Sequence, residues 1–174
     1  MSFFSPATTS RAPQPRLSIA APLWDELLEK LRERGGGMRE SGAFLLGDGT
    51  GPERVVRHIV LYDDLDRECL NEGYVRFDGR HYGRLWEICA AQKQNVVGDV
   101  HTHPFGPGQS HSDKTHPMVS IPGHIALIVP NYACPPVGAG DVGVYVYRGR
   151  HRWTAYRGRA AVRVLNIESG EQGS

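Results

Sequence analysis

The chain has 174 residues, of which 40% are hydrophobic, and its 20 lysines and arginines nearly balance 19 aspartates and glutamates. This length favours one domain with a core of its own, and a net charge of +1 predicts neither a nucleic-acid nor a membrane partner. The three cysteines form no Cys-x-x-Cys pair, which predicts reduced thiols and a cytoplasmic protein. We expect no secretory signal and no membrane helix.

Hydrophobic periodicity and glycine or proline breaks divide the chain into helices and strands. In chain order we expect a flexible arm over residues 1–16, a strand over 17–20, a helix over 23–34, strands over 43–46 and 55–62, a short edge strand over 75–77, a helix over 79–94, strands over 95–100 and 124–129, a hairpin over 142–156, a last strand over 162–167 and a polar tail over 169–174. This order predicts one α/β domain over residues 17–168, with helices packed on a sheet.

The predicted strand over 95–100 runs directly into the segment His-Thr-His-Pro at 101–104. Because side chains alternate along a strand, we expect His101 and His103 to point to the same face, where they can share one ion. Asp113 follows after a turn and could return to them as a third ligand, although capping the next helix is an alternative role. Two histidines, one carboxylate and an open position are a known arrangement for catalytic zinc.

Five positions of the chain together resemble the signature of the JAMM/MPN (JAB-domain) zinc metalloproteases. In that signature a glutamate precedes a glycine-bounded apolar strand and is followed by His-x-His-Pro and Ser-x-x-Asp; Glu40, His101, His103, Ser110 and Asp113 occupy these positions here. The resemblance spans roughly residues 17–156 and looks like a compact, bacterial-type member. Six residues separate the second histidine from the serine, one fewer than is common in the family, so we expect a tighter loop.

The resemblance implies a JAB/MPN (cytidine-deaminase-like) fold, which is a mixed curved sheet flanked by helices. It implies that His101, His103 and Asp113 bind one Zn²⁺, that Glu40 acts as acid and base for metal-activated water, and that Ser110 hydrogen-bonds the oxyanion. The implied activity is that of a deubiquitinase-like isopeptidase or peptidase. It would cut after the C-terminal tail of a ubiquitin-like protein, in deconjugation or in precursor processing.

The resemblance also implies the partners. The substrate would be a ubiquitin-like protein or its conjugate, and E1-like or E2-like proteins encoded in the same operon are possible further partners. In the family, segments that flank the metal line the groove for the substrate tail, and here these would be residues 61–78 and 115–140.

Two other functions stay open for this chain. One is an inactive MPN scaffold that only binds partners, although a scaffold has no need to keep the ligand set together with Glu40. The other is a zinc hydrolase of a different substrate class on the same fold. A deaminase would need a Cys-x-x-Cys zinc set, which is missing, and no basic stripe indicates a nucleic-acid surface.

Asp99 and Phe105 flank the signature, and each has two possible roles. Asp99 shares the face of the two histidines, so it would either orient one of them as a second-shell residue or pair with a nearby arginine. Phe105 would either contact substrate or pack on its own turn.

A second zinc site is a weaker candidate. Its possible ligands are His111, His116, His124 and Cys134. Their irregular spacing favours solvated loop histidines and a buried thiol instead. Four further residues are expected to pack in the core: Trp24, Trp86, Cys69 and Cys89.

Overall fold

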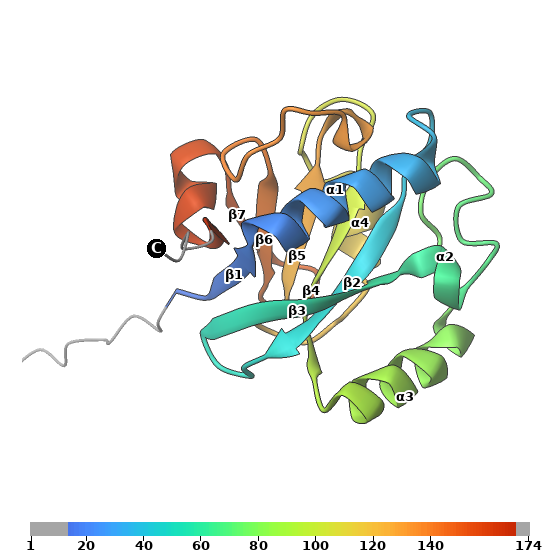
Figure 1. Ribbon diagram of the computed structural model, residues 1–174, viewed down its shortest axis with the longest axis horizontal. Coiled ribbons are helices and arrows are strands. Elements are labelled where there is room, and N and C mark those ends of the chain that lie inside the picture. Colours follow the sequence, from blue (N-terminus) through green and yellow to red (C-terminus); the bar gives the residue numbers. More distant parts are fainter. Residues whose placement is uncertain (1–13, 170–174) are drawn as a thin grey trace, which may run out of the picture.

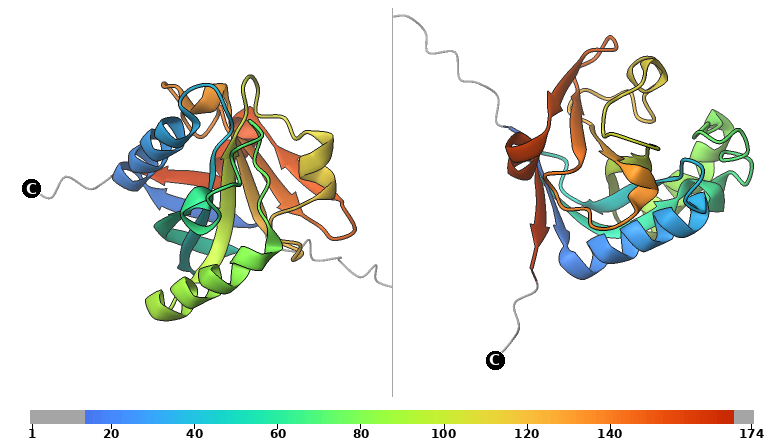
Figure 2. Two further views of the ribbon diagram at one scale, coloured as in Figure 1. Left: turned by 90° about the vertical axis from the view of Figure 1, so that its right-hand side faces the viewer. Right: turned by 90° about the horizontal axis from the view of Figure 1, so that it is seen from above.

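Eight strands form a single sheet in the computed structural model, which describes residues 14–169 (Figure 1). The strands are β1 (Arg16–Ala20), β2 (Gly42–Asp48), β3 (Glu53–Leu61), β4 (Asn95–Thr102), β5 (Ile125–Val129), β6 (Gly143–Tyr147), β7 (Trp153–Tyr156) and β8 (Leu165–Glu168). Their order across the sheet is β7-β6-β5-β4-β2-β3-β1-β8, with parallel and antiparallel pairs. The sheet curls like half of a barrel (Figure 2).

Helices lie on both faces of this sheet, so the fold is of the mixed α/β class (Figure 1). They are α1 (Ala21–Gly35), α2 (Tyr62–Leu65), α3 (Tyr82–Gln92) and α4 (His111–Thr115), together with the 3₁₀ turns η1 (Gly79–His81), η2 (Asn131–Ala133) and η3 (Gly158–Arg163). None of the described helices is long and apolar enough to cross a bilayer.

Helix α1 covers one face of the sheet because its apolar residues form a single stripe. Trp24, Leu27 and Leu31 are buried against strand residues such as Leu45 and Leu127. A proline in the first turn begins the helix, and Gly36 in the left-handed conformation ends it.

Helix α3 covers the opposite face, where a second apolar cluster forms. Leu85 and Cys89 of α3 pack with Phe44 and Leu46 of β2. These β2 residues alternate with those that face α1, so the one strand serves both clusters. Both faces of β2 are buried, which explains why its sequence is apolar almost without a break.

Several predicted elements were wrong in extent: the helix expected over 79–94 is divided into η1 and α3, which ends at Gln92, and Tyr62 begins α2 instead of ending a strand. Residues 75–77 form no strand, because Val75 N–H donates to the Glu40 carboxylate (3.2 Å) and Arg76 N–H donates to the Cys69 carbonyl (2.8 Å) rather than to a sheet neighbour. The last strand begins only at Leu165, after a 3₁₀ turn. β1 begins at Arg16, inside the expected arm, whose residues 1–13 lie outside the described part of the chain, as does 170–174 of the tail.

Two expectations about burial were also wrong. Trp86 is 49% exposed and stacks on Tyr82 at the surface, with ring centroids 6.0 Å apart. Cys134 is exposed, since it lies in a loop beyond η2. Trp24, Cys69 and Cys89 are buried as predicted.

Candidate metal centre

The two histidines lie at the end of the central strand β4, which holds their backbone on both sides. His101 stands opposite Gly42 of β2 and beside β5. His103 N–H donates to the Val129 carbonyl (2.9 Å), and its own carbonyl accepts from Tyr132 N–H of η2 (2.9 Å). Both histidines are buried, at 8% and 9% exposure. Their position is therefore fixed by the sheet.

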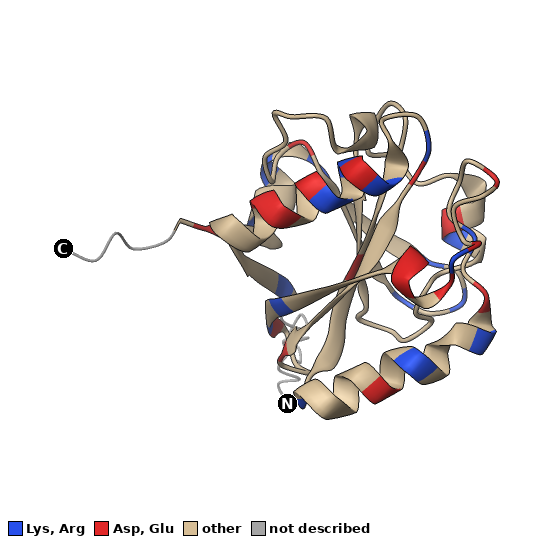
Figure 3. Cartoon of the chain, turned by 45° about the vertical axis from the view of Figure 1, so that its right-hand side comes forward, with Lys and Arg blue, Asp and Glu red and all other residues tan. Residues whose placement is uncertain are grey.

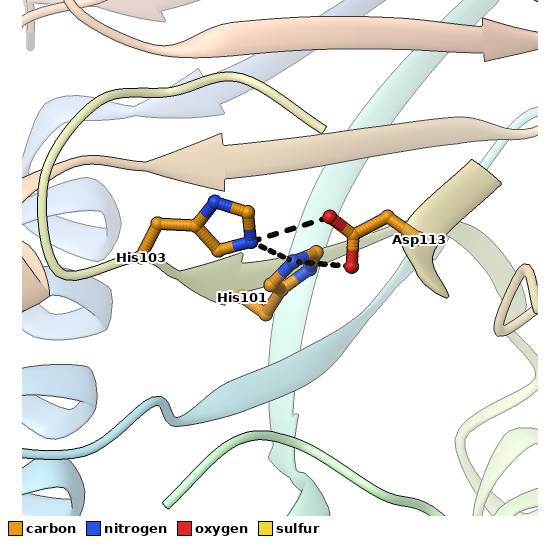
Figure 4. Close-up of side chains that lie close together, drawn as sticks. All are labelled: His101, His103 and Asp113. Carbon is orange, nitrogen blue, oxygen red and sulfur yellow. Dashed lines mark hydrogen bonds and ion pairs between the residues drawn. The ribbon is translucent and has the colours of Figure 1, made fainter. Parts of the chain in front are cut away.

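His101, His103 and Asp113 converge on one point (Figure 4). The Nε2 atoms of the two histidines are 3.0 Å apart. Asp113 Oδ1 lies 3.3 Å from His101 Nε2, and its Oδ2 lies 3.3 Å from His103 Nε2. All the possible ligand atoms fall within 4.8 Å of one another, so this group could hold a metal ion.

The charge of the cluster favours a cation. Burial alone would lower the pKa of His101, but hydrogen bonding to Asp113 and its negative charge leave that pKa above its ordinary value. Burial would raise the pKa of Asp113, yet the hydrogen bonds to both histidines hold it well below its usual range. Asp113 is therefore a carboxylate that faces two ring nitrogens and stabilises positive charge between them.

Glu40 lies beside this cluster. It comes just before β2, and its Oε1 is 3.8 Å from His103 Nε2. Its backbone N–H donates to the Gly73 carbonyl (3.0 Å), and its Oε2 accepts from Val75 N–H (3.2 Å). The segment after α2 thus fixes both the backbone and the carboxylate of Glu40.

Ser110 and Asp113 form a capping box at the start of α4. Ser110 Oγ accepts from Asp113 N–H (3.2 Å), and the Asp113 carboxylate accepts from Ser110 N–H (2.6 Å). Capping the helix and binding metal beside the histidines were alternative roles for Asp113. Its carboxylate contacts both the Ser110 N–H and the two histidine rings. Ser110 itself is exposed, and its contacts are those of a residue that orients Asp113.

Side chains from β6 and β7 tether the loop and helix that carry Asp113. Trp153 Nε1 donates to the Lys114 carbonyl (3.1 Å), one residue beyond Asp113. Tyr145 Oη donates to the Pro107 carbonyl (2.5 Å) and accepts from Arg157 Nη2 (3.0 Å). Figure 2 shows α4 beside this hairpin. Sequence reasoning missed these tethers, because they join segments about forty residues apart with no local signal.

Asp99 lies on β4, two residues before His101, but forms no hydrogen bond with either histidine of the cluster. It is 2% exposed and accepts from His124 Nε2 (2.5 Å) and from Tyr62 Oη (3.0 Å). The expected arginine partner is therefore wrong, and so is the description of His124 as a solvated loop residue, since His124 is buried. Burial, followed by the charge of Asp99, raises the pKa of Tyr62 well above its ordinary value.

The ring of Tyr62 reaches Asp99 by passing over Gly42. A Cβ atom on Gly42 would overlap this ring and the Val100 carbonyl. The glycine that bounds the apolar strand is required here by close packing.

A cavity of about 570 Å³ opens in front of the cluster. Glu40, His101 and Asp113 line it, and its two walls are residues 74–77 and 116–118. These walls fall within the two segments, 61–78 and 115–140, that the family resemblance implied. Phe105 lies outside the lining and is 83% exposed, so it does not pack on its own turn.

The second zinc site is not formed in the part of the chain that the structure describes. His101, His103 and Asp113 make up the one group of metal-binding geometry found there. Of the four candidates, His124 instead pairs with Asp99, and His116 Nδ1 contacts the Thr115 hydroxyl (3.0 Å).

No family model matches the chain. Solved structures do share its fold. The solution structure of a protein from Desulfitobacterium hafniense matches with a TM-score of 0.62 and 19% identity, covering 90% of this chain and 97% of that one. A solution structure from Salinibacter ruber matches with a TM-score of 0.53 and 17% identity, covering 90% of this chain and 94% of that one. At these identities the likeness shows the fold alone.

Proposed function

We propose that this protein is a zinc-dependent isopeptidase or peptidase of the JAMM/MPN type, with the JAB fold. It would hydrolyse the bond that follows the C-terminal tail of a ubiquitin-like protein. One observation carries the proposal: His101, His103 and Asp113 converge on one point, with Glu40 3.8 Å from His103 at the same cavity. Three ligands and a neighbouring carboxylate are what a hydrolytic metal site requires.

The ligand spacing supports zinc. Tetrahedral zinc with bonds of roughly 2.0–2.1 Å to nitrogen sets neighbouring ligand atoms about 3.3 Å apart. The two Nε2 atoms lie 3.0 Å apart, near this value, and each lies 3.3 Å from a different oxygen of the Asp113 carboxylate. Two neutral imidazoles whose Nε2 atoms face each other need either a shared proton or a shared cation. A site with three protein ligands leaves the fourth position for water or substrate.

The chain's own residues divide the hydrolysis between them. When bound, zinc would polarise the scissile carbonyl and lower the pKa of a coordinated water towards about 7. Glu40 accepts a proton from the attacking water as the new carbon–oxygen bond forms. Glu40 then delivers that proton to the leaving nitrogen as the carbon–nitrogen bond breaks. Its hydrogen bond from Val75 N–H keeps one oxygen occupied and leaves Oε1 facing the cluster.

Ser110 is the proposed donor to the oxyanion. Its Oγ accepts from Asp113 N–H, which leaves the hydroxyl proton free to donate to a developing negative charge. The capping box fixes Ser110 relative to Asp113, so ligand and donor move together.

The position of the cavity is compatible with a peptide as substrate. Residues 74–77 and 116–118 line it together with Glu40, His101 and Asp113. Tyr82 donates through its hydroxyl to the Met118 carbonyl and so links α3 to one wall. The substrate we propose for this cavity is a tail with small side chains, such as the glycines that end ubiquitin-like proteins.

The test combines metal content with cleavage. Purified protein should carry one zinc ion by native mass spectrometry, and it should cut a reporter fused to the C-terminal tail of a ubiquitin-like protein. Glu40→Gln should keep the zinc and lose cleavage by about 10²–10⁴-fold. Glu26→Gln, an exposed carboxylate paired with Lys30 on α1, should change neither.

Two results would reject parts of this proposal. If His101→Ala leaves the zinc content unchanged, the metal site is wrong. If the wild type binds zinc but cuts no member of a panel of such fusions, the protein is a metal-binding scaffold or a hydrolase of another class.

A further inference from the structure

The edge strand β7 and its flanking turns carry charge of one sign. Between Val142 and Ile167 the chain has six arginines and no lysine, aspartate or glutamate. All six side chains are exposed. We call them the basic edge: Arg148, Arg150, Arg152, Arg157, Arg159 and Arg163. Because the whole chain has a net charge of +1, the rest of the chain is net acidic, and the overall balance hides this local excess.

The sequence Tyr-Arg-Gly-Arg occurs twice, at 147–150 and at 156–159, once at each end of β7. The glycine has a positive φ in both copies, 84° at Gly149 and 54° at Gly158. Each copy therefore turns the chain and presents its arginines beside the sheet edge instead of inside the ladder. At about 3.3 Å per residue, the two turns lie roughly 17 Å apart.

Four arginines elsewhere in the described chain have carboxylate partners, and those of the basic edge do not. Arg34, Arg57 and Arg80 each lie within 2.9 Å of an aspartate oxygen. Figure 3 shows acidic and basic residues interspersed along α1 and α3. No residue of the basic edge forms an ion pair within residues 14–169.

Neutral groups take up only part of the hydrogen-bonding capacity of the basic edge. Arg148 donates to Thr154 Oγ1 (2.8 Å), and Arg157 donates to Tyr145 Oη. Most guanidinium donors are therefore available to an anion from outside.

We propose that the basic edge binds a nucleic-acid strand through its phosphates. The side chains present suit phosphate, because the guanidinium fork donates two parallel hydrogen bonds to phosphate oxygens. The two turns are far enough apart for arginines at both to contact different phosphates of one strand. Such contacts fix position without reading sequence. This activity is independent of the proposed hydrolase, and it is contrary to the expectation drawn from the whole-chain charge.

Two alternative roles for the basic edge make different demands on its residues. Charge on an exposed edge strand discourages pairing with other chains, but that role does not need the repeated turn. An acidic protein would also be attracted, but it would respond to charge alone and not to the shape of the fork.

The test is binding of labelled single-stranded DNA and RNA of about 20 nucleotides, followed by fluorescence anisotropy between about 50 and 200 mM salt. The variant Arg150→Gln/Arg152→Gln/Arg159→Gln should bind at least about tenfold more weakly, and its slope of log affinity against log salt should fall by about 2. The matched control replaces three exposed cations elsewhere, Arg67→Gln/Arg84→Gln/Lys93→Gln, and should stay within about twofold of wild type. Substitution of the same three edge arginines by lysine should restore most of the salt slope, which shows that the loss is not one of folding.

Three outcomes would overturn the proposal. The first is a wild-type dissociation constant weaker than about 10⁻⁴ M for both strands at the lower salt. The second is an equal loss in the basic-edge and control variants, which would indicate a response to net charge. The third is competition by poly-glutamate as strong as that by unlabelled oligonucleotide of equal charge, which would assign the edge to an acidic protein. None of these readouts depends on zinc or on cleavage, so the hydrolase can fail while this proposal stands.

Discussion

The two halves of the metal centre are built in different ways. His101 belongs to a strand that has neighbours on both sides, and His103 follows the end of that strand, where its backbone bonds to Val129 and Tyr132. Asp113 stands on the five-residue helix α4 beyond an exposed loop, and single hydrogen bonds from Trp153 and Tyr145 hold that loop and helix in place. The sheet thus supplies ligands that cannot move, and the hairpin supplies a ligand whose position depends on a few contacts.

The largest effect on zinc affinity should come from the two histidines, which the sheet holds and which we call the rigid half of the site. His103→Ala removes a ligand from a strand that cannot rearrange to replace it. We expect zinc affinity to fall by well over about 100-fold, beyond the range for residues that only support a ligand. Chelator competition measures this affinity. A loss of less than tenfold would show that the histidines are not the main ligands. Thermal unfolding of the metal-free protein should change little, since the imidazole is at the end of the strand.

The next largest effect should come from the Trp153 tether. Trp153→Phe keeps an aromatic ring and removes the N–H that holds the Lys114 carbonyl. We expect zinc affinity to fall by about 10–100-fold, as for other groups that orient a metal ligand.

Trp24→Phe is the matched control for that tether. Trp24 also donates through Nε1 to a backbone carbonyl, that of Val137 (3.2 Å), on the opposite face of the sheet. Trp24→Phe should lose more unfolding free energy than Trp153→Phe, because Trp24 is buried in the core and its truncation also leaves a cavity, but only Trp153→Phe should weaken zinc binding. Equal zinc affinity in the two variants would mean that α4 needs no tether.

A smaller effect is expected at Tyr145, which acts on the loop farther from Asp113. Tyr145→Phe removes the hydrogen bond to the Pro107 carbonyl and the acceptor for Arg157. We expect a cost of about 1 kcal/mol, divided between stability and a zinc affinity that is a few-fold weaker. Isothermal titration with zinc, beside denaturant unfolding, separates the two. If Tyr145→Phe bound zinc more weakly than Trp153→Phe, the hydrogen bond of Tyr145 would matter more for Asp113 than that of Trp153.

The smallest effect is a dependence of protein stability on pH, caused by Tyr62 beside strand β4. Burial raises the pKa of Tyr62 well above 10, so its contribution to stability is complete below about pH 10, the unfolded-state value, and is lost as the pH rises beyond it. Unfolding midpoints of the wild type should fall on that alkaline side. Tyr62→Phe should reduce the slope without abolishing it, because burial also raises the pKa of Tyr82 and of Cys69 to about 12. If the change of the unfolding midpoint with pH were the same in Tyr62→Phe as in the wild type, the Tyr62 hydroxyl would have to be open to water.

The rigid half was the part that sequence reasoning could describe. Strand alternation is a local rule, so the shared face of His101 and His103 follows from their spacing alone. The capping box is local as well, and it places Asp113 at the start of a helix. Which way that helix turns depends on Trp153, 39 residues beyond Lys114 in the chain, and no spacing rule predicts such a contact.

Errors elsewhere have the same origin. Asp99 was expected beside an arginine, but its partner His124 comes from the adjacent strand region 25 residues away. Residues 75–77 look like an edge strand because Val75 and Phe77 are β-prone, yet the carboxylate of Glu40 and the carbonyl of Cys69 accept the N–H groups of Val75 and Arg76. In each case a long-range partner competes with the local preference.

The packing of Tyr62 over Gly42 places a limit on how this sequence can change. No side chain fits at Gly42 while the aromatic ring lies across it, and a smaller residue in place of Tyr62 would leave Asp99 with one buried hydrogen-bond donor fewer. Neither position can be substituted first without loss, so single mutations are blocked and only paired changes remain open. Among distant relatives that lack Glu40 or the histidines, these two positions should therefore vary together.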